Sequence, residues 1–323
     1  MMAETVFLLQ QMMIFSIPML IVALGGMFAE RGGIVNIALE GIMITGAFTG
    51  ILFIYFIQGA EGGGSETGRH ILLPALLISA LSGVAAALPH AYASIHMKAN
   101  QIISGTAINM FAPAFAIYAA RTIRSVRQIP YRNVFFIEKI PGLGDIPLIC
   151  PFLFQRTYIT THLGFLILAV SWAVLCKTPF GLRLRACGEY PQAADSAGIS
   201  VYKTRFAGVL ISGGLAGLGG LAFVIPTAST FDATVAGYGF LALAVLIFGQ
   251  WKPWRILFAA FFFGMMKTVS VSYTSIGFLS GLPLPGAVYK MIPFVATLIV
   301  LSFTSRKSAA PRALGIPYEK ESG

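Results

Sequence analysis

Two ionisable side chains, Glu40 and Lys267, lie inside long apolar runs of this sequence. Glu40 follows Asn36 by four residues, and on a helix that spacing puts both side chains on one face. A charge in the middle of a bilayer costs about 2.5–3.5 kcal/mol, so each such residue needs a physical reason. One reason is a polar path across the membrane, or the helix contacts that line it. The other is pairing of Glu40 with Lys267 or with backbone groups, which would only hold helices together.

Amides and hydroxyls open another apolar run, which covers residues 101–120. These residues are Asn100, Gln101, Ser104, Thr106 and Asn109. Such groups can hydrogen-bond the hydroxyls of a sugar or the edge of a base, and they can equally bond one helix to another. As a set they outline a polar cavity better than any other part of the chain, whereas helix-to-helix bonding explains any one of them at least as well.

The composition explains why these polar groups stand out. Of 323 residues, 57% are hydrophobic and only 11% are charged, and the mean hydropathy is +0.81. A soluble domain spreads charges over every surface element, so this chain is expected in a lipid bilayer. The net charge of +10 does not indicate nucleic acid, because the basic residues flank apolar runs and form no single basic face.

The apolar runs predict an all-α, polytopic transmembrane bundle. A spanning helix needs about 20 apolar residues, and on that criterion there are about nine spans, with 8–10 as the range. They cover residues 7–28, 34–58, 71–94, 101–120, 161–177, 206–228, 236–250, 256–275 and 287–303. The shorter apolar piece 146–154 contains prolines and is expected to be re-entrant or interfacial. The whole chain 1–323 is predicted to be one transmembrane domain.

The distribution of Lys and Arg between the runs sets the expected orientation. With the amino terminus outside, most of these residues fall on the cytoplasmic side. Those left outside lie mainly in the long connection 121–160, where charge bias counts least. We therefore expect an external amino terminus and a cytoplasmic carboxyl terminus.

A glycine cluster marks the run 206–228. Its members are Gly213, Gly214, Gly217, Gly219 and Gly220. Small residues three or four apart let helix backbones approach closely. The cluster therefore predicts helix packing.

A polar stretch, 178–205, interrupts the apolar runs on the predicted cytoplasmic side. Pro191 suits the first turn of a helix and Gly198 suits its end. A helix of about two turns is marginal alone in water. Its small face at Ala193, Ala194, Ala197 and Ile199 suits a cleft in another protein, although a loop without a partner remains an alternative.

The sequence lacks the common motifs for phosphate binding, metal binding and nucleophilic catalysis. It contains no G-x-x-x-x-G-K-[ST] phosphate loop, no His-Glu metal pair and no nucleophile elbow. Cys150, Cys176 and Cys187 form no C-x-x-C pair, and with four histidines they offer no metal framework. We expect no catalytic residue, no metal site and no cofactor bound by this chain, so any energy source lies elsewhere or transport is passive.

Several segments resemble, in order, the permease subunits of bacterial ABC importers for nucleosides and simple sugars. They are ERGGIVNIALEGIMITGAF (30–48), NQIISGTAINMFA (100–112), TPFGLRLRACGEYPQAADSAGISVYKTR (178–205), ISGGLAGLGG (211–220) and GYGFLALAVLIFGQWKP (237–253). The VNIALEG sequence resembles the nucleoside type more than the ribose type. The sequence departs from the usual residues of the family at Ala38, Tyr190 and Lys252. The last two could change details of how such a subunit docks on its ATPase partner.

The resemblance implies a function and its partners. The loop 181–205 would dock on an ABC ATPase subunit, which would use the ATP. The residues expected to carry that contact are Arg183, Arg185, Gly188, Glu189, Pro191, Ala194, Asp195 and Gly198. A second permease subunit, either a copy or a related chain, and an extracytoplasmic substrate-binding protein would complete the importer in the bacterial cytoplasmic membrane. The substrate would be a nucleoside, with purine nucleosides favoured, or a related simple sugar.

Two other functions are alternatives to an importer subunit. A secondary transporter or channel could couple a small polar metabolite to ions or protons through Glu40 and Lys267. The other is an integral membrane enzyme, against which the lack of any catalytic constellation in the sequence argues. An ATPase bound at 181–205 separates the importer from the secondary transporter.

Overall fold

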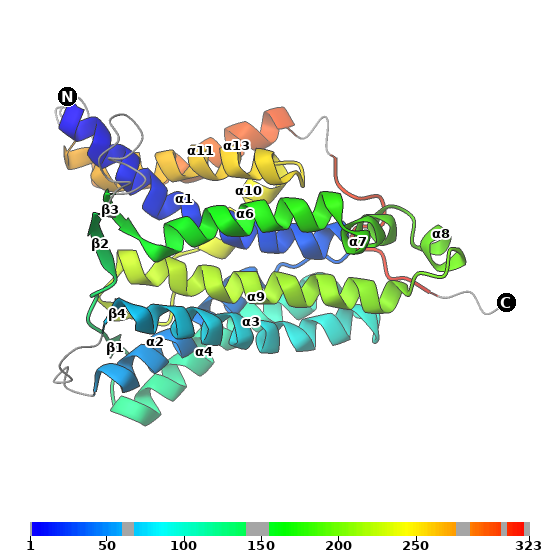
Figure 1. The fold of residues 1–323 in the computed structure, drawn as a ribbon, viewed down its shortest axis with the longest axis horizontal. Helices are drawn as coiled ribbons and strands as arrows, with labels where there is room; N and C mark the ends of the chain where they lie inside the picture. The colour runs from blue at the N-terminus through cyan, green and yellow to red at the C-terminus, as the bar shows by residue number, and fades with distance from the viewer. Residues whose placement is uncertain (1, 60–67, 140–154, 276–284, 305–308, 320–323) are drawn as a thin grey trace.

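The computed structural model describes residues 2–59, 68–139, 155–275, 285–304 and 309–319. These residues are mostly helical, and the helices lie side by side in one elongated bundle (Figure 1). The long helices are α1 (Met2–Arg31), α2 (Leu39–Gln58), α3 (Leu72–Ile95), α4 (Gln101–Arg124), α6 (Ile159–Lys177), α9 (Val201–Thr227), α11 (Pro253–Ser272) and α13 (Gly286–Thr304). The shorter ones are α7 (Pro179–Glu189), α8 (Pro191–Ser196) and α10 (Tyr238–Phe248), with 3₁₀ turns at Arg69–Ile71 and Tyr273–Ser275.

The helices account for the apolar runs of the sequence. Among the described residues, 7 helices are long and apolar enough to cross a membrane, so this is a multi-pass membrane protein. Each expected run coincides with a helix, but α10 has only 11 residues, which is about 16 Å of helix against a hydrocarbon core of about 30 Å. The number of nine spans therefore stays a prediction, and the segment 146–154 lies outside the described residues.

Helices α1 and α9 form the centre of the bundle. In the most apolar stretch of α1, 89% of the residues are buried, and in that of α9, 72% are buried. Helix α9 packs against α1, α2 and α3. A helix that is apolar on every side is expected in the interior, and these two match that expectation.

Glycines bring α2, α3 and α9 into backbone contact. A Cβ atom on Gly46 would overlap the backbone of Gly217, and one on Gly83 would overlap the carbonyl of Gly213. Ser79 on α3 donates a hydrogen bond to the Gly217 carbonyl at 2.6 Å. The predicted packing role of the glycine cluster is confirmed.

Two short strand pairs lie at one end of the bundle, and the polar helices α7 and α8 lie at the other (Figure 1). Strand β1 (Ile129–Pro130) pairs with β4 (Thr230–Phe231), and β2 (Phe136–Lys139) pairs with β3 (Gln155–Tyr158), both antiparallel. The expected all-α class therefore holds for the long elements, while the connections at this end add strands. The start of α1 lies at the strand end and the segment 309–319 lies at the α7–α8 end.

Candidate functional site

The chain leaves the helical path between α1 and α2. Residues 32–38 are non-helical, beginning at a glycine pair in which Gly33 has φ 94. The expected span 34–58 therefore starts as a helix only at Leu39. Asn36 lies in the break and Glu40 lies in the first turn of α2, so the prediction that they share one helix face is wrong.

Helix α4 supplies hydrogen bonds to the backbone of this break. Gln101 accepts the amide of Val35 at 2.7 Å. Asn109 accepts the amide of Gly41 at 2.7 Å and donates to the carbonyl of Ile37 at 2.8 Å. Non-helical backbone inside a membrane is tolerated only where protein groups or water satisfy its polar atoms. The side-chain amides of Gln101 and Asn109 therefore hold the break in place. This matches the alternative in which the polar residues of this segment bond one helix to another.

Helices α3 and α9 complete the support of the break. His90 donates from Nε2 to the Val35 carbonyl at 3.1 Å, and its Nδ1 lies 2.9 Å from Ser104 Oγ. Asn36, which is fully buried, donates to Ser212 Oγ at 2.8 Å. Neither His90 nor Ser212 was predicted as a site residue, although a histidine within an apolar run is a signal that could have identified His90.

Asn100 has a local role at the start of α4. Its Oδ1 accepts the amides of Ile102 at 2.9 Å and Ile103 at 3.2 Å, and the residue is exposed. This is an N-cap, in which a side-chain oxygen satisfies amides that the helix leaves free. Asn100 therefore starts the helix that carries Gln101 and Asn109.

Glu40 joins the start of α2 to the start of α10. Its carboxylate accepts the amide of Gly237 at 2.9 Å and that of Gly239 at 2.6 Å. A negative charge is favoured at a helix N-terminus, where free amides and the helix dipole meet. A Cβ atom on Gly239 would overlap the backbone of Glu40, so the glycine permits the approach.

The ion pair between Glu40 and Lys267, which was one alternative for Glu40, is not formed. Neither residue takes part in a salt bridge within the described parts of the chain, and Lys267 Nζ lies 5.8 Å from the centre of the Tyr238 ring. Free amides of α10 compete for the Glu40 carboxylate and are closer. Of the alternatives for Glu40, pairing with backbone groups is the one that the structure shows.

At the opposite end from the strands, the polar stretch 178–205 folds into two helices. Helix α8 begins at Pro191 as expected, and Gly198 follows it with φ 78. Helix α7 was not expected; Thr178 caps it by accepting the amide of Gly181 at 3.2 Å. In α8, Pro191 and Ala194 are buried, so Ala194 does not belong to the free face. The exposed residues of this turn are Gln192, Ala193, Ser196 and Ala197.

The segment 309–319, which we call the C-terminal strap, lies against α7 and the break. Ala313 donates its amide to the Gly188 carbonyl at 2.8 Å, and Gly315 donates to the Gly33 carbonyl at 3.0 Å. Lys98 Nζ lies 2.6 Å from the Glu319 carboxylate, an exposed ion pair. The strap thus ties the polar end of the molecule to the segment between α1 and α2.

Arg205 fixes the strap from inside. Its side chain, 2% exposed, donates to the carbonyls of Ile316 at 3.0 Å and Cys187 at 3.2 Å. Tyr318 packs on Tyr202 with ring centres 5.4 Å apart, and it shares a small apolar core with Cys187, Ala194 and Val201. Burial raises the pKa of the Cys187 thiol.

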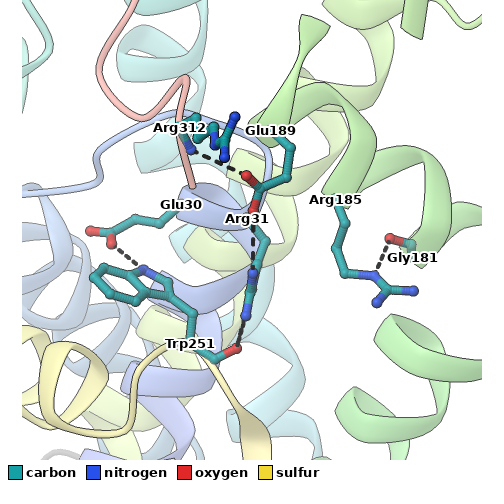
Figure 2. A network of polar contacts seen from close by, with 7 residues as sticks. All are labelled: Glu30, Arg31, Gly181, Arg185, Glu189, Trp251 and Arg312. Atoms are coloured by element: carbon teal, nitrogen blue, oxygen red, sulfur yellow. Dashed lines mark hydrogen bonds and ion pairs between the residues drawn. The ribbon is translucent and has the colours of Figure 1, made fainter. Parts of the chain in front are cut away.

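A second set of contacts links α1 to α7 and to the turn before α11 (Figure 2). Trp251 donates from Nε1 to Glu30 at 2.6 Å, and Arg31 donates to the Trp251 carbonyl at 2.9 and 3.2 Å. Arg31 also lies 3.9 Å from Glu189, which accepts the amide of Arg312 at 3.5 Å. These contacts join α1 both to α7 and to the turn before α11.

The other expected residues of α7 have distinct surroundings. Gly188 is buried, and a Cβ atom on it would overlap the Arg31 carbonyl. Arg185 donates from Nε to the Gly181 carbonyl of its own helix at 3.3 Å (Figure 2). Arg183 is exposed, and Asp195 on α8 is half-buried.

The comparisons with known proteins agree with this architecture. Residues 8–301 match the family described as branched-chain amino acid transport system / permease component. The chain is 42% identical to the guanosine ABC transporter permease protein NupQ of Bacillus subtilis (strain 168), over 95% of both chains. It is 38% identical to the nucleoside ABC transporter permease protein NupC of Lactococcus lactis subsp. cremoris (strain MG1363), over 96% of this chain and 95% of the relative.

A more distant relative comes from the first of these organisms. The chain is 25% identical to the guanosine ABC transporter permease protein NupP of Bacillus subtilis (strain 168), over 92% of this chain and 81% of the relative. No solved structure matches. The chain belongs to the family of branched-chain amino acid transport system permease components, as a membrane transport subunit and not an enzyme.

Proposed function

We propose that this chain forms half of the translocation path of an ABC importer for nucleosides, with purine nucleosides as the favoured substrates. The observation that carries the proposal is full-length similarity to two permeases whose names specify guanosine and nucleosides. A related simple sugar is the other substrate class, since the ribose of a nucleoside offers the same hydroxyls. The protein would reside in the bacterial cytoplasmic membrane as one permease domain, 1–323, with about nine spans.

The α7–α8 end is the proposed contact with the ATPase. The exposed turn formed by Gln192, Ala193, Ser196 and Ala197 is small enough to enter a cleft. Contacts behind it support the role, because Gly188 is bonded to the C-terminal strap, Cys187 is bonded to Arg205 and Glu189 is paired with Arg31. The partner would bind and hydrolyse ATP, and α7 would pass its motion to α1. This end, with the carboxyl terminus, would be cytoplasmic and the amino terminus external.

The polar set around the break is the proposed inner support of the path. Backbone groups are the hydrogen-bond partners of Glu40, Gln101 and Asn109. They would therefore shape the path by positioning the breaks before α2 and α10, and Asn36 and Ser104 would act with them. Broken helices near mid-membrane are the usual device for this purpose in transporters. Lys267, half-buried beside Tyr238, is the remaining candidate for direct contact with a solute.

The second permease subunit is proposed to be a related but different chain. Two guanosine permeases of one organism, NupQ and NupP, are both similar to this chain, at 42% and 25% identity. Helix α4 offers a surface for such a partner, since its most apolar stretch is only 17% buried. Its exposed side chains include Ile103, Met110, Phe111 and Tyr118. A substrate-binding protein would deliver the solute at the strand end.

Reconstituted transport tests the proposal. Proteoliposomes would contain this chain, its partner permease, the ATPase and the binding protein, and uptake of labelled guanosine would be measured with and without ATP inside. Unlabelled guanosine and adenosine should compete, whereas ribose and branched-chain amino acids should not. ATP-independent uptake driven by a proton gradient would support the secondary transporter instead.

A further inference from the structure

A half-open cavity of about 410 Å³ lies between α1, α6, α7 and the turn that leads into α11. Its cationic lining consists of Arg31, Arg185, Lys252 and Arg255. At about 30 Å³ for each water molecule, the cavity has room for on the order of ten waters and therefore for a phosphate group. None of the proposed transport residues within the membrane lines it.

The cavity carries an excess of positive charge. No Asp or Glu appears among its described lining residues. Glu30 accepts a hydrogen bond from the Trp251 indole at 2.6 Å, and Glu189 lies 3.9 Å from Arg31, one of the four lining cations. Arg255 donates to Gln250 at 2.6 Å, which leaves the charge of the guanidinium uncompensated. A cluster of this kind attracts an anion.

Tryptophan side chains form another part of the cavity lining. The chain has 3 Trp residues, and all of them, Trp172, Trp251 and Trp254, line this one cavity. Lys177 Nζ also lies 5.7 Å from the centre of the Trp172 ring. Tryptophan and basic side chains meet in this way at the level of the lipid headgroups.

An apolar stripe runs from the mouth of the cavity along α11. Trp254, Phe258 and Phe262 follow one another at four-residue spacing and share one face of the helix. They are 51%, 68% and 36% exposed. Acyl chains can lie against such a stripe while a headgroup occupies the basic cavity, an arrangement that a free phosphate compound would not need.

We propose that this cavity binds the phosphate headgroup of an anionic bilayer lipid, with its acyl chains along the Trp254–Phe262 stripe. Basic pockets at the cytoplasmic ends of transmembrane helices take such headgroups. The walls come from α1, α6, α7 and α11. Arg31 already links α1 to α7 and to the turn before α11, so a bound lipid would stabilise the same arrangement of helices. The proposal depends on the cavity and not on which solute the protein carries.

Lipid titration of the purified full chain is the first test. Phosphatidylglycerol or phosphatidylcholine would be added in detergent, and bound lipid would be counted by native mass spectrometry. The chain should retain phosphatidylglycerol and not phosphatidylcholine. The double variant K252Q/R255Q should bind phosphatidylglycerol about 25-fold more weakly, since each basic residue near an anionic surface contributes about fivefold.

A matched control separates the cavity from general attraction. R183Q/K203Q removes two exposed cations at the same end of the molecule that do not line the cavity, and it should leave lipid retention unchanged. Equal loss in both double variants would overturn the proposal. Displacement of the lipid by millimolar inorganic phosphate would also overturn it, because the site would then hold a free anion.

Cysteine protection gives a second readout that does not depend on charge variants. Cys176 is exposed and lines the cavity, whereas Cys187 is buried. In a C150S variant, phosphatidylglycerol should slow alkylation of Cys176 several-fold relative to phosphatidylcholine. Unchanged alkylation at saturating phosphatidylglycerol would show that the lipid lies elsewhere and would overturn the assignment, while a thermal unfolding curve confirms that the variant is folded.

Discussion

The carboxylate of Glu40 accepts the amide of Gly239 at 2.6 Å, so the start of α2 is bonded to the start of α10. The two helices follow the two breaks of the chain, 32–38 and the segment after α9. A carboxylate that binds free amides at a helix N-terminus supplies both charge and acceptors. Glu40 therefore joins the two helices that follow these breaks.

Removing the Glu40 carboxylate should lower the stability of the folded protein. Glu40→Leu leaves the amides of Gly237 and Gly239 without their partner, at a cost of about 1–3 kcal/mol each. Glu40→Gln keeps an acceptor oxygen and should lose less. Thermal unfolding in detergent, with Lys267→Gln as a control expected to unfold like the wild type, checks this. Rescue of Glu40→Lys by Lys267→Glu would contradict the account, because it would require the ion pair that the structure lacks.

Asn109→Leu should impair assembly and transport together. The variant removes the partner of the Gly41 amide and of the Ile37 carbonyl, each worth about 1–3 kcal/mol when left unsatisfied. Thr106→Val is the matched control, since Thr106 is exposed on the same helix and bonds only within it. Chain yield in membranes and nucleoside uptake would be compared. A well-folded Asn109→Leu protein with normal yield and no uptake would instead indicate direct contact with the solute.

The free face of α8 should be essential for coupling and dispensable for folding. Ala193→Trp places a bulky group on an exposed position, and Asp195→Lys reverses a charge beside it. Both variants should remain in the membrane with wild-type melting temperature while losing ATP-dependent uptake by at least about tenfold, a loss of about 1.4 kcal/mol or more of coupling free energy. Asp232→Lys, which reverses an exposed charge directly after strand β4, should couple normally. Normal uptake in Ala193→Trp would argue against docking at this turn.

Truncation after residue 308 should loosen the α7–α8 end. Arg205 would lose the Ile316 carbonyl, Gly188 would lose the amide of Ala313, and the core around Cys187 would lose Tyr318. Limited proteolysis should then cut near α8 faster than in the full chain. Glu319→Gln, which removes only an exposed ion pair, should digest like the wild type, because exposed pairs add little. Equal protection of the truncated chain would show that the strap is dispensable.

The reactivity of the cysteines should report how the C-terminal strap packs around Cys187. Burial raises the pKa of the Cys187 thiol, so at neutral pH it holds less of the reactive thiolate than an ordinary cysteine. Maleimide should therefore label Cys176 first and Cys187 only slowly, with labelling of Cys187 rising as the pH is increased. Truncation after residue 308 should expose Cys187 and speed its labelling. Rapid labelling of Cys187 in the intact chain would contradict the packing of the strap.

Local sequence signals predicted the helices well and the breaks poorly. Apolar runs placed the long helices because hydrophobic length is a property of each segment alone, and Pro191 placed the start of α8 for the same reason. The break at 32–38 stayed hidden, since its residues are as apolar as a helix and it persists only because Gln101 and Asn109, distant in sequence, satisfy its backbone. Hydropathy likewise gave no hint that 309–319 packs on Arg205.

A site-directed cross-link at α8 tests the central claim most directly. A single cysteine would replace Ala193 in a chain whose native cysteines are changed to Ala or Ser, carry a photoreactive maleimide, and be irradiated in native membranes. The same label at Asp232 serves as the control, being exposed at the strand end. The account predicts that mass spectrometry finds an ABC ATPase attached at position 193 and none at 232. Repeated capture of no ATPase at 193, with the chain abundant and folded, would contradict it.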